Sequence, residues 1–286
     1  MLQLVVGQLL NGVIVGTLYG IIALAVTLTS GITGIVNFAL GVYMMLGAYV
    51  AWYLTNVAGI AYPLAVLAAV GAVAVIGLVS DLLLFRFTRN NLINGLIVSL
   101  GLISVFVALV LMLWTTTPQV LNPILPGVFR IGEVVVPKTK AVMFLILLTV
   151  ILLTYVSLTK TWIGRAAFAF SQNPEAAALM GVRTEVLQIG VATYCAGLCG
   201  LGGALYASLY SIGPEIGGLY MLKGIEAAVV AGVGSVLGAL AGGILIGVTE
   251  GVGAIFLPLA FTDAYGLVFL VLILLFKPAG LFSSQK

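Results

Sequence analysis

Few residues of this 286-residue chain could carry out chemistry. It contains no histidine, so it lacks the usual general base of Ser–His and Cys–His catalysis and a common zinc ligand. Its two cysteines, Cys195 and Cys199, are spaced i, i+4, and two thiolates without further ligands make a poor metal site. We therefore expect them to pack as small residues, and we expect neither a catalytic residue nor a metal site.

The sequence also has no recognisable site for nucleotides or nucleic acids. No Gly-x4-Gly-Lys-Ser/Thr sequence is present to hold nucleotide phosphates. Gly232-x-Gly234 lies in an apolar stretch, without the strand and helix context of a dinucleotide site. A net charge of +3 without a run of basic residues argues against nucleic-acid binding.

The composition instead indicates a membrane protein. Of the residues, 63% are hydrophobic and 7% are charged, against about 25% charged in an average soluble domain. The first charged side chain is Asp81, and further uncharged runs cover 90–129, 141–159, 186–214 and 227–249. Because a membrane-spanning helix needs about 20 mostly apolar residues, these runs supply several spans.

The apolar stretches predict an all-α, polytopic membrane protein with about eight transmembrane helices. Continuous apolar runs without strict alternation favour helices over a closed barrel. The expected segments are roughly 8–29, 35–55, 61–80, 92–114, 141–158, 187–209, 224–249 and 255–276.

Glycines make several segments irregular. Gly234, Gly238 and Gly242 are spaced four apart, as are Gly243, Gly247 and Gly251. Such spacing permits close helix packing, but it also permits broken or re-entrant helices that line a path. For helix packing the expected positions are Gly197, Gly200, Gly234, Gly238 and Gly242. For a pathway we select polar or glycine positions in the irregular segments, namely Asn37, Gly41, Asn94 and Ser99. The last segment is interrupted near Pro258 and Asp263.

Three loops separate the segments. Loop 115–140 contains two β-type runs, 128–131 and 134–136, around Gly132–Glu133, which predict a hairpin outside the bilayer. Loops 81–91 and 159–185 lie on one side, because two segments separate them. If all eight spans are unbroken, the Lys and Arg counts on the two sides of the membrane do not decide which side is cytosolic. If the glycine-rich seventh segment is broken, they favour a cytosolic side for both loops and the tail, which is the arrangement we prefer.

Loop 159–185 contains a pattern typical of a short capped helix. Asn173 is a good N-cap, and Pro174 suits the first helical position. Glu175 complements the helix dipole in the first turn, and Gly181 suits a left-handed C′ position. A helix this short is marginal alone, so it must dock on its own bundle or in a cleft of a soluble partner.

The sequence Glu175-Ala176-Ala177-x3-Gly181 resembles the coupling motif of ABC-transporter permeases. The family's continuing Ile-x-Leu-Pro is absent, since Val191-Ala192-Thr193-Tyr194 stands there. Other stretches resemble branched-chain amino-acid ABC permeases of the LivH type: Gly34 to Gly41, Met45 to Tyr49, Gly164-Arg165-Ala166, Ala196 to Gly203, Gly232 to Gly251, and Lys277 to Phe282.

The resemblance implies one permease of an importer in the bacterial or archaeal inner membrane. The chain would be a single transmembrane domain, 1–286, with an extramembrane hairpin loop at 115–140 and a cytosolic coupling loop at 159–185. Its partners would be a second permease of the LivM type, two cytosolic ATPases that bind ATP and Mg, a periplasmic solute-binding protein and the lipid bilayer, with no cofactor in this chain. The residues that would couple to the ATPases are Arg165, Asn173, Pro174, Glu175, Ala176, Ala177, Leu179, Met180 and Gly181.

The substrate implied is a branched-chain or related small neutral amino acid, moved by alternating access; urea and short amides are alternatives within the family. From a different class, an ion-coupled secondary transporter would need buried carboxylates. Glu226 lies within reach of Lys223 on a helix, whereas Glu250 and Asp263 are expected at interfacial ends. We therefore expect pairing or exposure of these groups rather than a buried carboxylate cluster. A membrane enzyme is disfavoured, because no polar residues converge at one face.

Overall fold

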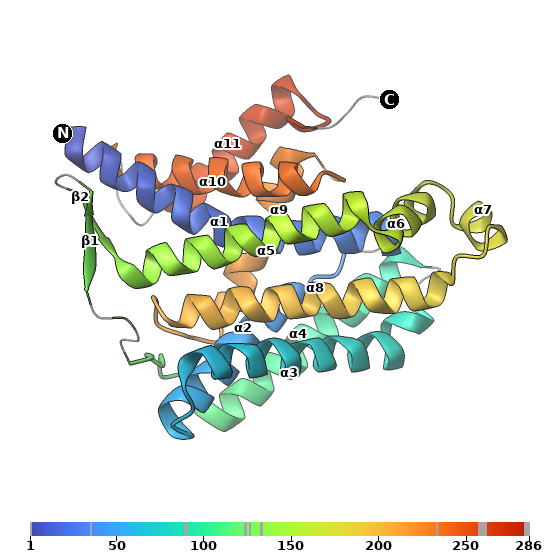
Figure 1. Ribbon diagram of the computed structural model, residues 1–286, viewed down its shortest axis with the longest axis horizontal. Helices are drawn as coiled ribbons and strands as arrows, with labels where there is room; N and C mark the ends of the chain where they lie inside the picture. Colours follow the sequence, from blue (N-terminus) through green and yellow to red (C-terminus); the bar gives the residue numbers. More distant parts are fainter. Residues whose placement is uncertain are drawn as a thin grey trace. The chain divides into compact units, whose positions relative to one another are not determined.

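The structure is a computed structural model that describes residues 2–34, 36–88, 91–122, 125, 127–131, 134–232, 234–256 and 262–282. It is built almost wholly from helices, with one small hairpin (Figure 1). In chain order the elements are α1 (Leu2–Thr33), α2 (Ala39–Trp52) with its π-helical continuation η1 (Tyr53–Val57), α3 (Tyr62–Leu83) with the 3-10 turn η2 (Phe85–Phe87), α4 (Leu92–Trp114), β1 (Val128–Ile131), β2 (Val134–Pro137), α5 (Lys138–Lys160), α6 (Trp162–Gln172), α7 (Pro174–Leu179), α8 (Thr184–Ala207), α9 (Ile216–Ala231), α10 (Val236–Phe256) and α11 (Thr262–Phe276).

Within the described residues, seven helices are long and apolar enough to cross a membrane, and Ala264–Phe276 forms a shorter apolar helix. The seven are Leu4–Thr33, Ala39–Val57, Tyr62–Phe87, Leu92–Trp114, Lys138–Lys160, Thr184–Ala207 and Val236–Phe256. The predicted class, an all-α polytopic membrane protein, is therefore confirmed. The first six predicted segments correspond to α1, α2 with η1, α3, α4, α5 and α8.

The predicted boundaries of the last two segments were wrong, because the chain turns inside the stretch taken as the seventh. Helix α9 ends at Ala231 and α10 begins at Val236, so the preferred broken form is the one observed. Gly232 and Gly234 have φ angles of 88° and 113°, which L side chains rarely adopt. Helix α10 then continues to Phe256, past the predicted end at 249. Pro258 lies outside the described residues.

The predicted hairpin is present. Strands β1 and β2 pair antiparallel, with Phe129 opposite Val136 and Ile131 opposite Val134. The intervening Gly132–Glu133 lies outside the described residues. That the hairpin lies outside the bilayer stays a prediction.

The contacts of the chain form two compact units, which are described separately. The first comprises Met1–Thr27, Asn122–Ile151 and Leu222–Lys286; the second comprises Leu28–Leu121 and Leu152–Met221. In the second unit, α2, α3 and α8 pack against one another. Glycines bring these backbones together, since Gly47 on α2 lies against Gly200 on α8, and Gly203 lies against the Met44 carbonyl. Close approach through small residues is typical of helices in lipid, where van der Waals packing drives association.

In the first unit, α1 and α10 meet through facing rows of glycines. Gly12 and Gly16 on α1 lie against Gly247 and Gly243 on α10, and a Cβ added to Gly247 would lie 2.7 Å from the Gly16 Cα. Gly251 continues the α10 row against the Gln8 carbonyl. The α10 spacing is therefore a packing stripe, and its partner is the N-terminal helix.

We expect Gly247→Ala to lower the stability of the purified protein by about 1–3 kcal/mol, because the added methyl group forces two backbones apart. Gly71→Ala on α3 is the matched control, since a Cβ there meets no described atom within 4 Å. Its effect should be neutral or stabilising by about 1 kcal/mol through helix propensity. Thermal unfolding in detergent measures both variants. Equal midpoints for the two would contradict close packing at Gly247.

The C-terminal segment Lys277 to Phe282 closes the open end of α9. The backbone N–H groups of Leu281 and Phe282 donate to the carbonyls of Val230 and Ala231, each at 2.9 Å. Carbonyls in the last turn of a helix lack intrahelical partners, so these bonds satisfy them where the chain leaves α9. Gly280, with φ 85°, lies against the Gly232 backbone. The terminal motif therefore stabilises the break between α9 and α10.

Candidate functional site

The predicted coupling segment begins with a sharp elbow between α5 and α6. The Thr161 side chain caps α6 by accepting a hydrogen bond from the Gly164 backbone N–H at 3.3 Å. Gly164 lies so close to the Leu158 carbonyl that a side chain would not fit there. Glycine at this position therefore allows the first turn of α6 to pack directly against the end of α5.

Helix α6 is amphipathic. Ala166, Ala167 and Phe170 are buried, whereas Arg165 is exposed, as are Ile163 and Phe168. The buried row packs α6 onto the second unit. Arg165, one of the predicted coupling residues, therefore faces away from the packed side.

Helix α7 begins where the sequence predicts. The Asn173 side chain accepts a hydrogen bond from the Ala176 backbone N–H at 3.0 Å, and Pro174 occupies the first helical position. Glu175 lies in the first turn, exposed, where its charge complements the helix dipole.

The end of α7 is a Schellman motif. The Val182 N–H donates to the Ala177 carbonyl at 3.1 Å, and the Gly181 N–H donates to the Ala178 carbonyl at 3.0 Å. Gly181 has a φ of 86°, which places it in the left-handed region predicted for it. The motif fixes the direction in which the chain leaves α7 for α8.

The two sides of α7 differ. Ala177 is buried in an apolar cluster with Ile32, Ala167 and Phe170, which Val182, Leu187 and Val191 join. Leu179 and Met180 are 89% and 86% exposed. The short helix thus rests on its own bundle through Ala177, and it also presents two large apolar side chains outward.

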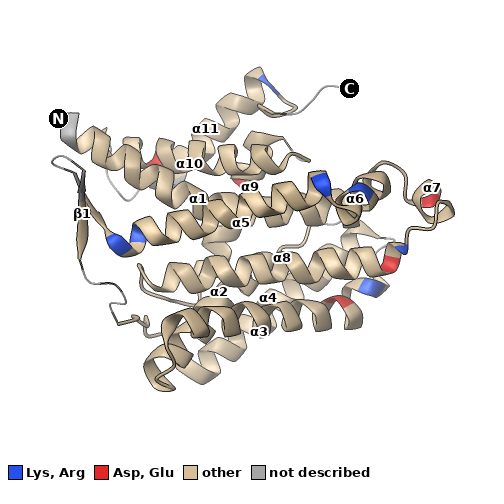
Figure 2. Ribbon diagram, viewed as in Figure 1, with Lys and Arg blue, Asp and Glu red and all other residues tan. Residues whose placement is uncertain are grey.

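Charged residues gather around α6, α7 and the start of α8 (Figure 2). Arg86, in the turn after α3, forms an ion pair with Glu185 at 2.9 Å. This contact confirms that loops 81–91 and 159–185 lie on the same side. Both side chains are half exposed, so the pair contributes little stability.

The four predicted pathway positions have local structural roles. The Asn37 side chain accepts a hydrogen bond from the Ala39 N–H at 2.9 Å, just before α2. Gly41 packs against the backbone of Gly217, and Asn94 is exposed at the start of α4. Ser99 is buried and donates to the Leu96 carbonyl of its own helix. Their assignment to a pathway stays a prediction.

The predicted packing glycines differ in how closely they pack. Gly200 lies tightly against Val73, and Gly242 lies tightly against the Ala227 carbonyl of α9. Gly197 makes ordinary contacts with Ala74, whereas Gly238 faces Ser235 and Ala231 beside the break. The packing prediction was wrong for Gly234, which lies in the turn before α10, where a Cβ would meet no described atom within 4 Å. Its positive φ is the physical reason for glycine there.

Cys195 and Cys199 are both buried in α8.

The expectation that no buried carboxylate cluster forms was wrong. Lys223, Glu226 and Glu250 are each only 5% exposed in the first unit. The Lys223 Nζ lies 2.6 Å from Glu250 Oε1 and 3.5 Å from Glu226 Oε2, and the Tyr19 hydroxyl donates to Glu250 Oε2 at 2.8 Å. We call these four residues the ionic cluster. Lys223 and Glu226 form the i, i+3 pair that the sequence predicted, and the turn before α10 brings Glu250 back to them.

A family model described as "Branched-chain amino acid transport system / permease component" matches residues 8–277 of the chain. The high-affinity branched-chain amino acid transport system permease protein BraD of Pseudomonas aeruginosa is 31% identical over 295 residues, covering 98% of this chain and 96% of the relative. The probable branched-chain amino acid transport permease protein LivH of Methanocaldococcus jannaschii is 30% identical over 298 residues, covering 96% and 91%.

The fold is also similar to that of a solved structure. That structure is PsaBC from Streptococcus pneumoniae in complex with Fab, with a TM-score of 0.52 and 14% sequence identity. The alignment covers 92% of this chain and 90% of that chain. At this identity the likeness concerns the fold alone.

Proposed function

The chain belongs to the family of permease components of branched-chain amino acid transport systems, and we propose that its substrate is a branched-chain or related small neutral amino acid. The near-complete coverage of BraD and LivH supports this proposal. The observation that carries the ABC-importer mechanism is α7, a helix capped at both ends that exposes Leu179 and Met180.

We propose the partners from a nucleotide-binding motif that this chain lacks and from apolar side chains that it exposes. Its sequence has no Gly-x4-Gly-Lys-Ser/Thr motif, so two cytosolic ATPases would bind ATP and Mg and hydrolyse the nucleotide. Leu179 and Met180 would enter an apolar cleft on an ATPase. A second permease of the LivM type would complete the pathway, and a periplasmic binding protein would deliver the solute. The assembly would lie in the inner membrane, with α7 on the cytosolic side.

Coupling would pass from α7 into the membrane helices by direct packing. Ala177 anchors α7 in an apolar cluster that also contains Leu187 at the start of α8. Helix α8 in turn packs against α2 and α3 through Gly200 and its neighbours. Because close-packed backbones leave little free space, a displacement of α7 would be transmitted to α8 and would move it relative to α2 and α3. Alternating access would then arise from two packings of these helices.

The test is transport by the complete importer in proteoliposomes, with the binding protein and radiolabelled leucine outside and ATP inside. We expect uptake that requires ATP and both ATPases and that excess unlabelled valine or isoleucine suppresses. Urea and acetamide, as competitors, test the alternative substrates, and suppression by them alone would overturn the amino-acid assignment.

The ionic cluster is the observation that favours an ion-coupled secondary transporter, since buried carboxylates can bind a coupling cation or proton. The same proteoliposomes decide between the classes. Uptake driven by a sodium or proton gradient in vesicles that contain this chain without the ATPases would contradict the importer mechanism.

A further inference from the structure

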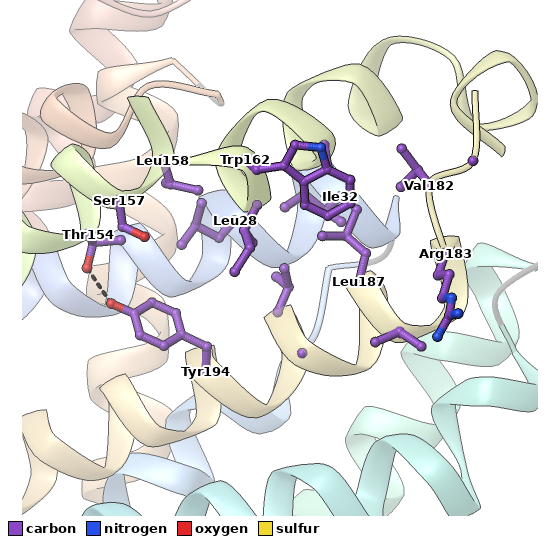
Figure 3. A pocket seen from close by; sticks show the side chains of 16 residues that line it. Leu28, Ile32, Thr154, Ser157, Leu158, Trp162, Val182, Arg183, Leu187 and Tyr194 are labelled. Atoms are coloured by element: carbon purple, nitrogen blue, oxygen red, sulfur yellow. Dashed lines mark hydrogen bonds between the residues drawn. The ribbon is translucent and has the colours of Figure 1, made fainter. Parts of the chain in front are cut away.

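The second unit contains a cavity of ≈580 Å³ beside the coupling segment. Its walls come from the ends of three long apolar helices, α1, α5 and α8, together with α6 (Figure 3). The lining is mostly apolar and includes Leu28, Ile32, Leu158, Trp162, Leu187 and Val191. A cavity of this size and character suits an apolar chain or ring rather than a small polar solute.

The two ends of the cavity differ in polarity. At one end Thr154 and Tyr194 share a hydrogen bond through their hydroxyl groups, and at the opposite end stands the Arg183 guanidinium (Figure 3). Because the two hydroxyls are hydrogen-bonded to each other, the inner end makes no strong demand for a polar ligand. The Arg183 end instead places a cationic guanidinium beside any ligand in the cavity.

The length of the cavity matches one membrane leaflet. Arg183 immediately precedes α8 and Tyr194 lies on it, which at about 1.5 Å per residue separates them by about 16 Å along the helix axis. Half of a hydrocarbon core about 30 Å thick is about 15 Å. An acyl chain of one leaflet could therefore lie along α8 from the Arg183 end to the Tyr194 end.

The charge at the opening is positive. No carboxylate among the described residues forms an ion pair with Arg183, and nearby Glu185 is already paired with Arg86. The same 159–185 loop also contains Lys160, Arg165 and Glu175, none of which lines the cavity. Trp162, an amphipathic ring that favours the membrane interface, lines the cavity and is 63% exposed.

We propose that this cavity binds an anionic phospholipid, with one acyl chain along α8 and the headgroup phosphate at Arg183. Because Val182 and Arg183 line the cavity and lie between the cap of α7 and the start of α8, the lipid would order the joint through which α7 acts on α8. An apolar protein segment fits less well, because the outward side chains of α7, Leu179 and Met180, are not among the residues that line the cavity.

The test begins with the complete importer, delipidated and exchanged into nanodiscs of phosphatidylglycerol and phosphatidylcholine with matched acyl chains. Native mass spectrometry after release counts the lipids that remain bound. We expect one retained phosphatidylglycerol per copy of this chain. Gly190→Trp should abolish that retention, because Gly190 lines the cavity and an added Cβ there meets no described atom within 4 Å, so the indole is expected to fill the acyl site.

Gly101→Trp on α4 is the matched control, since that glycine is equally open but lies outside the cavity. Equal lipid retention by Gly190→Trp and Gly101→Trp would overturn the proposal. Arg183→Gln should reduce the preference for phosphatidylglycerol over phosphatidylcholine about fivefold, the size of one basic contact with an anionic lipid. Lys160→Gln, outside the lining, should keep most of the preference. An unchanged preference in Arg183→Gln would overturn the headgroup assignment.

Discussion

Gly181→Val is expected to lower ATP-driven uptake by about tenfold or more while leaving membrane insertion intact. The reason is conformational, since Gly181 has a φ of 86° and a β-branched residue is strongly disfavoured there. An added Cβ would meet no described atom within 4 Å, so the backbone conformation rather than a neighbouring residue sets the cost. The cost of about 1–2 kcal/mol falls on a helix of six residues that is marginal by itself. Loss of its C-cap would release Leu179 and Met180 from their fixed direction.

Gly181→Asn is the matched control, because asparagine also adds a side chain but tolerates the left-handed conformation. We expect it to retain most of the uptake. Uptake of leucine and ATP hydrolysis are measured together in proteoliposomes, with the amount of reconstituted chain determined for each variant. If valine and asparagine reduce uptake equally, the left-handed cap is not what coupling requires. Normal uptake by the valine variant would contradict a role for α7 itself.

Features set by neighbouring residues were predictable from the sequence. Asn173 and Gly181 define the ends of α7 because capping depends on a few adjacent backbone groups. The hairpin of β1 and β2 was predictable for the same reason, since two β-type runs flank a turn pair. The long apolar runs identified the helices because length and hydropathy alone decide whether a segment can span a membrane.

Contacts between distant segments were harder to predict. The spacing of Gly243, Gly247 and Gly251 indicated a packing face, but spacing does not name the partner, and the structure places Gly12 and Gly16 of α1 there. The position of α7 was predictable, whereas Ile32, against which its buried Ala177 packs, comes from the distant end of α1.

The ionic cluster was missed for a related reason. Lys223 and Glu226 are close in sequence, but Glu250 reaches them only because the chain reverses between Ala231 and Val236. Glu250 was expected at an interfacial end because the predicted segment 224–249 ends beside it. The two glycines with positive φ, Gly232 and Gly234, were the available signal of the reversal.

Lys223→Met should destabilise the protein by about 3–5 kcal/mol, because it removes the cation that contacts two buried carboxylates. Glu226 and Glu250 would then face each other in a region from which water is excluded, each only 5% exposed. Gly266 of α11 also lies against both carboxylates, so repulsion between them would disturb the packing of α9, α10 and α11. Thermal unfolding of the purified protein in detergent measures the loss.

Two variants separate charge from packing. The triple variant Lys223→Met, Glu226→Gln, Glu250→Gln keeps the shapes but removes the uncompensated charge, so it should recover most of the lost stability. Lys160→Met, which removes an exposed lysine, should change stability by no more than about 0.5 kcal/mol. If Lys223→Met unfolds at the same temperature as the parent, the two carboxylates do not depend on Lys223 for their charge balance. If the triple variant is as unstable as Lys223→Met, the lysine acts through its packed hydrocarbon chain rather than through its charge.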